Sequence, residues 1–140
     1  MKLKFSKAQT SFEFLLMVVI GISILVPIIG YVSLYEVSYR DAYKISMAKD
    51  AVDKLGEAAE SIYIQGYPAK MSLTISVPEG VHSSLVDKET IMFSLSTSSG
   101  QTDIYSNPKA NVTGTLPIGA GYHKIMISNE RTFIKIIEGS

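Results

Sequence analysis

The sequence predicts an α+β protein in which one long N-terminal α-helix packs on a small antiparallel β-sheet domain. Three observations support this fold class. Residues 14–35 form an apolar run of 22 residues without a charge, a stripe of apolar residues at helical spacing follows it, and beyond Pro68 apolar and polar residues alternate as they do in strands. The chain has 140 residues, 46% of them hydrophobic, which suits one domain of ordinary size.

The first eight residues, MKLKFSKA, form a short basic segment that carries Lys2, Lys4 and Lys7. Basic residues on the N-terminal side of an apolar run favour a cytoplasmic N-terminus, with the bulk of the chain outside. A secretory signal peptide has an apolar core of about 7–15 residues followed by a small-residue cleavage site. The run that follows here is too long for that class, so we expect it to remain in the folded chain.

The apolar run 14–35 is long enough to span a membrane as a helix. At about 1.5 Å per residue it reaches roughly 33 Å, against a bilayer core of about 30 Å. Pro27 lies inside the run and deletes one backbone hydrogen bond, which predicts a helix kink or a locally melted turn. Four tyrosines at four-residue spacing resemble the aromatic belt of a membrane interface: Tyr31, Tyr35, Tyr39 and Tyr43.

The helix is expected to continue past the apolar run with a narrower apolar face and charged residues on its other sides. Gly66 and Pro68 then supply a left-handed cap and a stop. The predicted helix therefore runs from about Thr10 to Ile64, within a helical segment 9–64. Its apolar face consists of Ile45, Ala48, Val52, Leu55, Ala59 and Ile62.

Residues 69–140 are expected to form the globular β domain. Turn residues, mostly Gly, Pro, Asn and Ser, separate its alternating segments. Such alternation suits a sheet that is covered on one side, and the amphipathic half of the helix is the expected cover. The predicted strands are Lys70–Val77, Thr90–Thr97, Tyr122–Ser128 and Thr132–Ile137.

Composition argues against several classes of function. Thirteen basic and 13 acidic side chains cancel, which removes the electrostatic argument for a nucleic-acid partner. The absence of Cys excludes thiolate metal sites and Cys nucleophiles. His82 and His123 have no Asp or Glu at ligand spacing nearby, so we expect no metal and no cofactor. Neither a nucleophile elbow nor a phosphate-binding loop occurs in the sequence, which therefore gives no reason to predict an enzyme.

Glu13 is unusual because it lies at the edge of the apolar run. A carboxylate at bilayer depth costs about 2.5–3.5 kcal/mol on insertion scales, so it needs a partner or a polar layer. One interpretation is local: Thr10-x-x-Glu13 is a capping box, in which Thr10 caps the helix and Glu13 returns the bond, with the carboxylate among the lipid headgroups. The other interpretation is a partner outside this segment.

Residues 7–16, KAQTSFEFLL, resemble the class III signal peptide of archaeal type IV-like pilins. In that family a prepilin peptidase cuts before a Gln that is followed by Ser and then Glu at two-residue spacings, and Gln9, Ser11 and Glu13 match. Four residues after the Glu the pattern usually has Leu, where this chain has Met17. Less specific similarities extend the resemblance over most of the chain, at residues 51–60, 63–66 and 78–81.

The resemblance implies a type IV pilin-like fold and cleavage between Ala8 and Gln9 on the cytoplasmic side, with Lys7, Gln9, Ser11 and Glu13 as the cleavage and assembly motif. The product would hold ten basic and 13 acidic side chains, because three of the 13 basic residues lie in the leader 1–8. Glu13 would meet the terminal amine of a neighbouring subunit, since a buried carboxylate must be paired. If Gln9 cyclises and loses its amine charge, a nearby hydroxyl or backbone donor would replace it.

The same resemblance implies a homo-oligomeric filament. The precursor would cross the cytoplasmic membrane once, N-terminus inside, and then move to the cell surface as a subunit of an extracellular type IV-like pilus used for surface adhesion. Residues 14–35 would form the filament core, and a broken segment at Pro27 would let the helix stretch as subunits pack. Assembly would need a prepilin peptidase, a cytoplasmic ATPase and a membrane platform.

Two other functions stay open. An uncleaved single-pass membrane protein with an extracellular β-rich binding domain would share this topology and differ in processing. An archaellin, a subunit of the archaeal swimming filament, fits less well because that family usually has Gly at the cut site.

Asn111-Val112-Thr113 is an N-glycosylation sequon in a segment rich in turn residues. We place this segment outside the cell, where the modification would be made. Asn111 is therefore a candidate glycosylation site, and the chain a candidate glycoprotein.

Overall fold

The computed structural model describes residues 4–139, with side chains from Gln9 onward. The chain divides into two units, one ending at Tyr39 and the other beginning at Arg40. The division falls inside the single helix α1 (Lys4–Gln65). Seven strands follow: β1 (Lys70–Val77), β2 (Val81–Lys88), β3 (Thr90–Thr97), β4 (Gly100–Ser106), β5 (Val112–Gly114), β6 (Gly121–Asn129) and β7 (Ile134–Glu138).

α1 is helical without interruption over its whole length. It begins earlier than the predicted start near Thr10, and it ends next to the predicted end at Ile64. The helix continues through Pro27, although this residue has no N–H to donate to the carbonyl four residues before it. The chain therefore does not melt locally at Pro27.

A glycine cap ends α1 as the sequence predicts. Gly66 has a left-handed φ of 77°, and its N–H donates to the carbonyls of Ile62 at 3.1 Å and Tyr63 at 3.2 Å. Glycine adopts this conformation without the steric penalty that a Cβ brings. Pro68 follows two residues later and cannot continue the helix, so the chain turns into β1.

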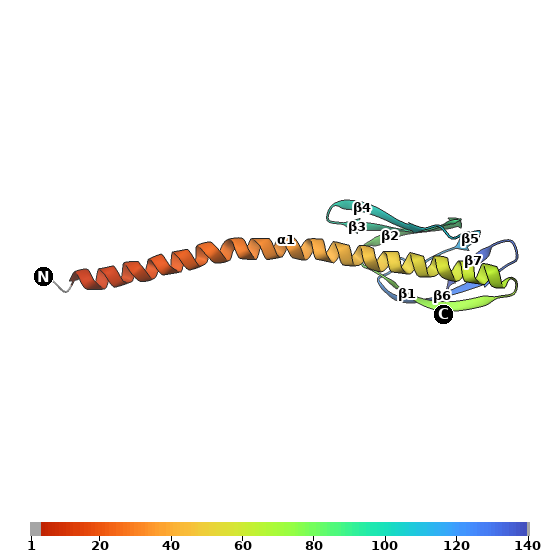
Figure 1. The fold of residues 1–140 in the computed structure, drawn as a ribbon, viewed down its shortest axis with the longest axis horizontal. Helices are drawn as coiled ribbons and strands as arrows, with labels where there is room; N and C mark the ends of the chain where they lie inside the picture. Colours follow the sequence, from red (N-terminus) through yellow and green to blue (C-terminus); the bar gives the residue numbers. More distant parts are fainter. Residues whose placement is uncertain (1–3, 140) are drawn as a thin grey trace. The chain divides into compact units, whose positions relative to one another are not determined.

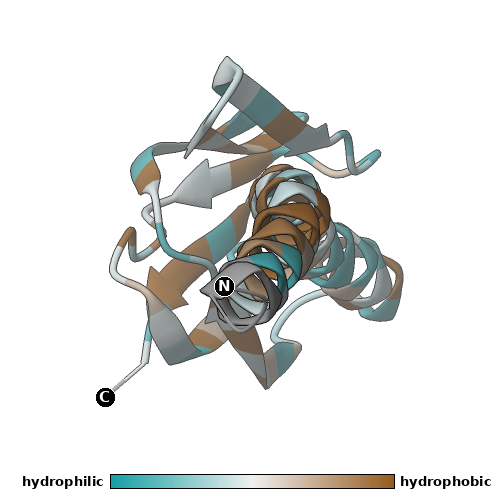
Figure 2. Ribbon diagram, turned by 90° about the vertical axis from the view of Figure 1, so that its left-hand side faces the viewer, coloured by the Kyte–Doolittle hydropathy of each residue, from teal (hydrophilic) through white to brown (hydrophobic). Residues whose placement is uncertain are grey.

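The seven strands form one sheet in the order β1-β6-β7-β5-β2-β3-β4. All neighbouring strands are antiparallel except β5 and β7, which pair in parallel with Gly114 opposite Ile136. Figure 1 shows β2, β3 and β4 on one side of the Arg40–Gln65 part of α1, with β1 and β6 on the other. Figure 2 shows the same arc of strands from a second direction. The predicted α+β fold, a helix packed on an antiparallel-rich sheet, is confirmed, and the sheet curls around the helix.

The amphipathic part of α1 supplies the helix side of the core. The predicted apolar face is buried as expected: Ala48, Val52, Leu55, Ala59 and Ile62 have no exposed area, and Ile45 is partly buried against them. Phe93 and Ile127 are among the fully buried strand residues that pack in the same core. Gly56 lets the end of β4 come close to the helix. A Cβ built on this residue would lie only 2.7 Å from Ser106 Oγ.

The sequence predicts four of the seven strands. β1 and β3 have the predicted bounds, and β6 and β7 overlap the predicted segments. β2, β4 and β5 are not predicted because each buries few apolar side chains. Val81 and Val86 are the buried residues of β2, Ile104 is the one in β4, and β5 has three residues in all. An alternating pattern is too sparse there to stand out from a loop.

Candidate membrane and assembly segment

Residues 14–35 of α1 are apolar on all sides and uncovered. Every side chain from Gln9 to Tyr39 is exposed. The exposed fractions of its large apolar side chains run from 42% at Val18 to 74% at Leu34. The helix is long and apolar enough to cross a membrane, by length and composition. A helix that is apolar all round is normally buried in lipid or in other protein.

Three serines within or near the apolar run donate their hydroxyl hydrogen bonds to carbonyls of the same helix, four residues earlier. Ser23 Oγ donates to the Val19 carbonyl at 2.7 Å, and Ser33 Oγ donates to the Ile29 carbonyl at 3.0 Å. Ser38 Oγ makes the same contact, with the Leu34 carbonyl at 3.4 Å. Because a hydroxyl without a partner is costly in an apolar medium, these internal bonds make the segment compatible with lipid.

The motif residues Gln9, Ser11 and Glu13 lie on α1 with exposed side chains. Gln9 and Glu13 are four residues apart and share one face of the helix, whereas Ser11 lies near the opposite face. The expected cleavage position falls between Ala8 and Gln9, and the side chains of Lys7 and Ala8 lie outside the described residues. Both residues belong to the helical part of the chain.

The capping-box interpretation of Thr10 and Glu13 does not hold in this chain. A capping residue is the boundary residue of a helix, with non-helical backbone. Since α1 begins at Lys4, Thr10 is already inside the helix. The local explanation of Glu13 as part of a cap is therefore wrong for the intact chain.

The tyrosine row marks the end of the apolar run. Tyr31, Tyr35, Tyr39 and Tyr43 are all more than half exposed. The Tyr31 and Tyr35 rings stack with their centroids 6.3 Å apart. Exposed rings with free hydroxyl ends are what an aromatic belt at a membrane interface requires.

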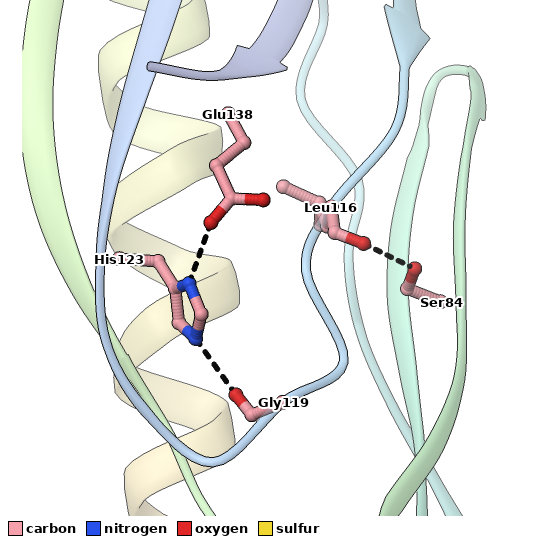
Figure 3. A network of polar contacts seen from close by, with 5 residues as sticks. All are labelled: Ser84, Leu116, Gly119, His123 and Glu138. Atoms are coloured by element: carbon pink, nitrogen blue, oxygen red, sulfur yellow. Dashed lines mark hydrogen bonds and ion pairs between the residues drawn. The ribbon is translucent and has the colours of Figure 1, made fainter. Parts of the chain in front are cut away.

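A polar contact at His123 is one of several in the second unit that sequence spacing did not indicate. His123 of β6 lies beside Glu138 of β7, with 2.7 Å between Nδ1 and Oε1 (Figure 3). The two residues are 15 positions apart in sequence, so ligand spacing along the chain did not indicate this contact. Strand pairing brings them together, because Ile125 of β6 lies opposite Glu138.

Neither histidine belongs to a metal-ligating cluster in the described part of the chain. Residues 9–139, whose side chains the structure describes, hold no group of three or more His, Cys, Asp or Glu side chains that could bind a metal ion. His82 is exposed, with its Nε2 atom 2.8 Å from Gln101 Nε2. The Nε2 atom of His123 faces the Gly119 carbonyl at 2.8 Å, so a backbone acceptor lies where a catalytic His would need a nucleophile.

Asn111 has an exposed side chain directly before β5, while its backbone is held in the sheet. The Ile134 N–H donates to the Asn111 carbonyl at 2.7 Å. Thr113, the third residue of the sequon, is also exposed. The position is therefore accessible to a modifying enzyme.

A groove of about 470 Å³ lies in the second unit, and no local sequence pattern predicts it. Arg40, Tyr43 and Lys44 of α1 form one wall, and Val77 and Tyr122 of β1 and β6 contribute to the other. Tyr122 is 83% exposed. These residues are scattered along the chain, and only the curl of the sheet brings them to one place.

Within the described residues, the fold is α+β, and one helix is long and apolar enough to cross a membrane. Comparisons with protein-family models, with curated proteins and with solved structures give no match to this chain.

Proposed function

We propose that this chain is a filament subunit similar to archaeal type IV-like pilins, which polymerises through α1 into an extracellular pilus used for surface adhesion. One observation carries the proposal: α1 is uncovered and apolar between Phe14 and Tyr35, yet it continues directly into an amphipathic part whose apolar face is buried. One part of the helix anchors the β unit, and the other requires a cover that residues 9–139 do not supply.

The free energy at stake is large. Fully burying one Val, Leu, Ile or Phe side chain is worth about 1.5–3 kcal/mol, and residues 14–35 expose more than a dozen such side chains. Lipid supplies the cover for the precursor. In the filament the same segments of neighbouring copies pack against each other, so the apolar surface exchanges lipid for protein.

The Glu13 carboxylate provides the polar part of this proposal. Removal of residues 1–8 creates a terminal amine at Gln9, one helical turn from Glu13 on the same face. In a bundle of apolar helices, the carboxylate pairs with the terminal amine of a neighbouring copy, because a buried charge is tolerated only when it is paired. Cleavage by a prepilin peptidase precedes assembly, and a cytoplasmic ATPase and a membrane platform extract the subunits.

The decisive experiment is electron microscopy of sheared surface filaments combined with N-terminal peptide mapping. The proposal expects filaments that contain this chain, with a first residue at Gln9 or its cyclised form. A cellular protein that begins at Met1, stays in the membrane fraction and is absent from filaments would reject it. That outcome would favour the single-pass membrane protein with a β-rich binding domain.

A Glu13→Gln variant tests the assembly step separately. We expect normal membrane insertion but a strong loss of filaments, because the amide cannot neutralise a buried amine. N-terminal mapping of the variant separates this loss from a loss of cleavage. Glu57→Gln is the matched control, since Glu57 is an exposed carboxylate of α1 in the covered part of the helix. Equal filament yields from both variants would contradict the pairing role of Glu13.

A further inference from the structure

His123 is held on both sides of its ring. It is the third residue of β6, and its Nδ1 atom lies 2.7 Å from Glu138 Oε1. Its Nε2 atom lies 2.8 Å from the carbonyl oxygen of Gly119, in the connection between β5 and β6. Figure 3 shows the ring bridging the two groups. The side chain is 21% exposed, so water has limited access to these contacts.

Both groups that face the ring are acceptors. A carboxylate and a backbone carbonyl offer only lone pairs, and a neutral imidazole carries a single N–H. Only the doubly protonated ring can donate to both at once. The hydrogen bond to Glu138 raises the pKa of His123 above its ordinary 6.5, and the Gly119 carbonyl and the Glu138 charge add to this against the opposing effect of partial burial.

The connection 115–120 is attached to the sheet at two ends. At its start, the Thr115 N–H donates to the Ile136 carbonyl at 3.1 Å, and Ser84 Oγ of β2 donates to the Leu116 carbonyl at 3.1 Å. At its other end, the Gly119 carbonyl contacts the His123 ring. The first attachment holds no titratable group, whereas the second depends on a ring nitrogen that can lose its proton.

We propose that His123 is a proton-dependent clamp, which holds the connection 115–120 against β6 and β7 when both ring nitrogens are protonated and releases Gly119 when one proton is lost. The remaining proton stays on Nδ1, because a charged acceptor makes the stronger hydrogen bond. The Nε2 lone pair then faces the lone pairs of the Gly119 carbonyl. That contact is repulsive, so the carbonyl moves away.

Among the groups around the ring, Glu138 is the one that sets the pH at which His123 loses its proton. β7 presents the Glu138 carboxylate, β1 presents Ile75 opposite His123, and the connection presents a neutral carbonyl. Among the described residues, Glu138 is the one charge that acts on the ring. The connection leads into Gly121 and Tyr122, which line the groove, so its release loosens one wall of that groove.

The clamp can be tested on the full chain in detergent micelles, whether or not the chain forms filaments. The sequence contains two histidines, so ¹⁵N-histidine labelling gives two ring systems in NMR spectra, which an H123Q variant assigns. We expect both nitrogens of His123 to stay protonated to a pH above about 6.5. The backbone amide signals of residues 118–120 should shift at the same midpoint. A singly protonated His123 ring at pH 6 would overturn the proposal. So would backbone amide signals in the connection that do not shift as the ring titrates.

A Glu138→Gln variant distinguishes the clamp from a partly buried histidine whose protonation has no effect on the connection. The amide removes the negative charge, so the titration midpoint of His123 should fall, and the transition of the backbone amide signals of residues 118–120 should fall with it. Glu89→Gln, at an exposed acid elsewhere in the second unit, should change neither the His123 midpoint nor the amide transition. If the His123 midpoint moves in Glu138→Gln while the amide transition stays in place, the connection is not controlled by the ring and the clamp is wrong.

Discussion

Asp41 of α1 accepts a hydrogen bond from the Ser98 backbone N–H at 2.9 Å, and the Ser98 hydroxyl donates a second one to the same carboxylate oxygen. Ser98 lies in the turn between β3 and β4, so the contact joins the helix to the tip of a hairpin that is 57 residues away in sequence. The hydroxyl and then the N–H lower the pKa of Asp41 below its ordinary 3.8. In the folded chain, the hydrogen bonds from Ser98 therefore favour the ionised Asp41 side chain over the protonated one.

The first prediction concerns acid stability. Because the folded pKa of Asp41 is depressed, its stabilising effect is present above about pH 3.8 and is lost as the pH falls through the folded value. Asp41→Asn should therefore lower the unfolding midpoint of the second unit at pH 7, and the difference from the parent should shrink in acid. Asp50→Asn, at an exposed i,i+4 pair with Lys54, is the control. A difference that persists unchanged below the folded pKa would contradict the role of the charge.

Leu55 tests the buried face of α1. Leu55→Ala removes a fully buried side chain and should destabilise the second unit by about 2–5 kcal/mol. Ile64→Ala lies on the same helix at 83% exposure and should change stability by less than about 0.5 kcal/mol. Urea unfolding of the full chain in micelles measures both. Similar losses from the two variants would mean that the helix does not pack on the sheet through this face.

Gly114 tests the parallel pairing of β5 and β7. A Cβ at this position would lie 1.8 Å from the Ile136 carbonyl oxygen, and the residue has a φ of 148°. Gly100 has a φ of 126° but open space around the missing Cβ, so Gly100→Ala should show only backbone strain, about 1–3 kcal/mol. Gly114→Ala should destabilise clearly more, because β7 must also move. Equal losses in thermal unfolding would show that β5 does not lie beside Ile136.

A charge in the apolar run should prevent stable insertion. Ile22→Lys places a charge near the middle of the segment, at a cost of about 2.5–3.5 kcal/mol on insertion scales. The membrane-bound fraction after alkaline extraction should therefore fall. Ser46→Lys, at an exposed position of α1 in the second unit, should leave that fraction unchanged. Retention of the Ile22→Lys protein in the membrane would argue that residues 14–35 do not cross it.

Local patterns predict much of this chain because they record which face of an element is buried. The spacing of Ala48, Val52, Leu55 and Ile62 identifies the packed face of α1, and Gly66 identifies the end of the helix. β1 and β3 are equally clear, since their alternation follows from one covered face. Gln9, Ser11 and Glu13 are interpreted through their resemblance to a family motif, and the exposed apolar helix supports the proposed use.

The apolar run, the amphipathic stripe and the cap were determined by the sequence alone, since each depends on residues within a few turns of one another. Tertiary structure alone decided the parallel pairing of β5 with β7, the groove beside Tyr122 and the position of Glu138 next to His123. These features depend on which distant strands become neighbours, and a sheet that curls around a helix brings together residues that no local period connects. His123 shows the difference: its surroundings look unremarkable along the chain, and the fold surrounds its ring with two acceptors.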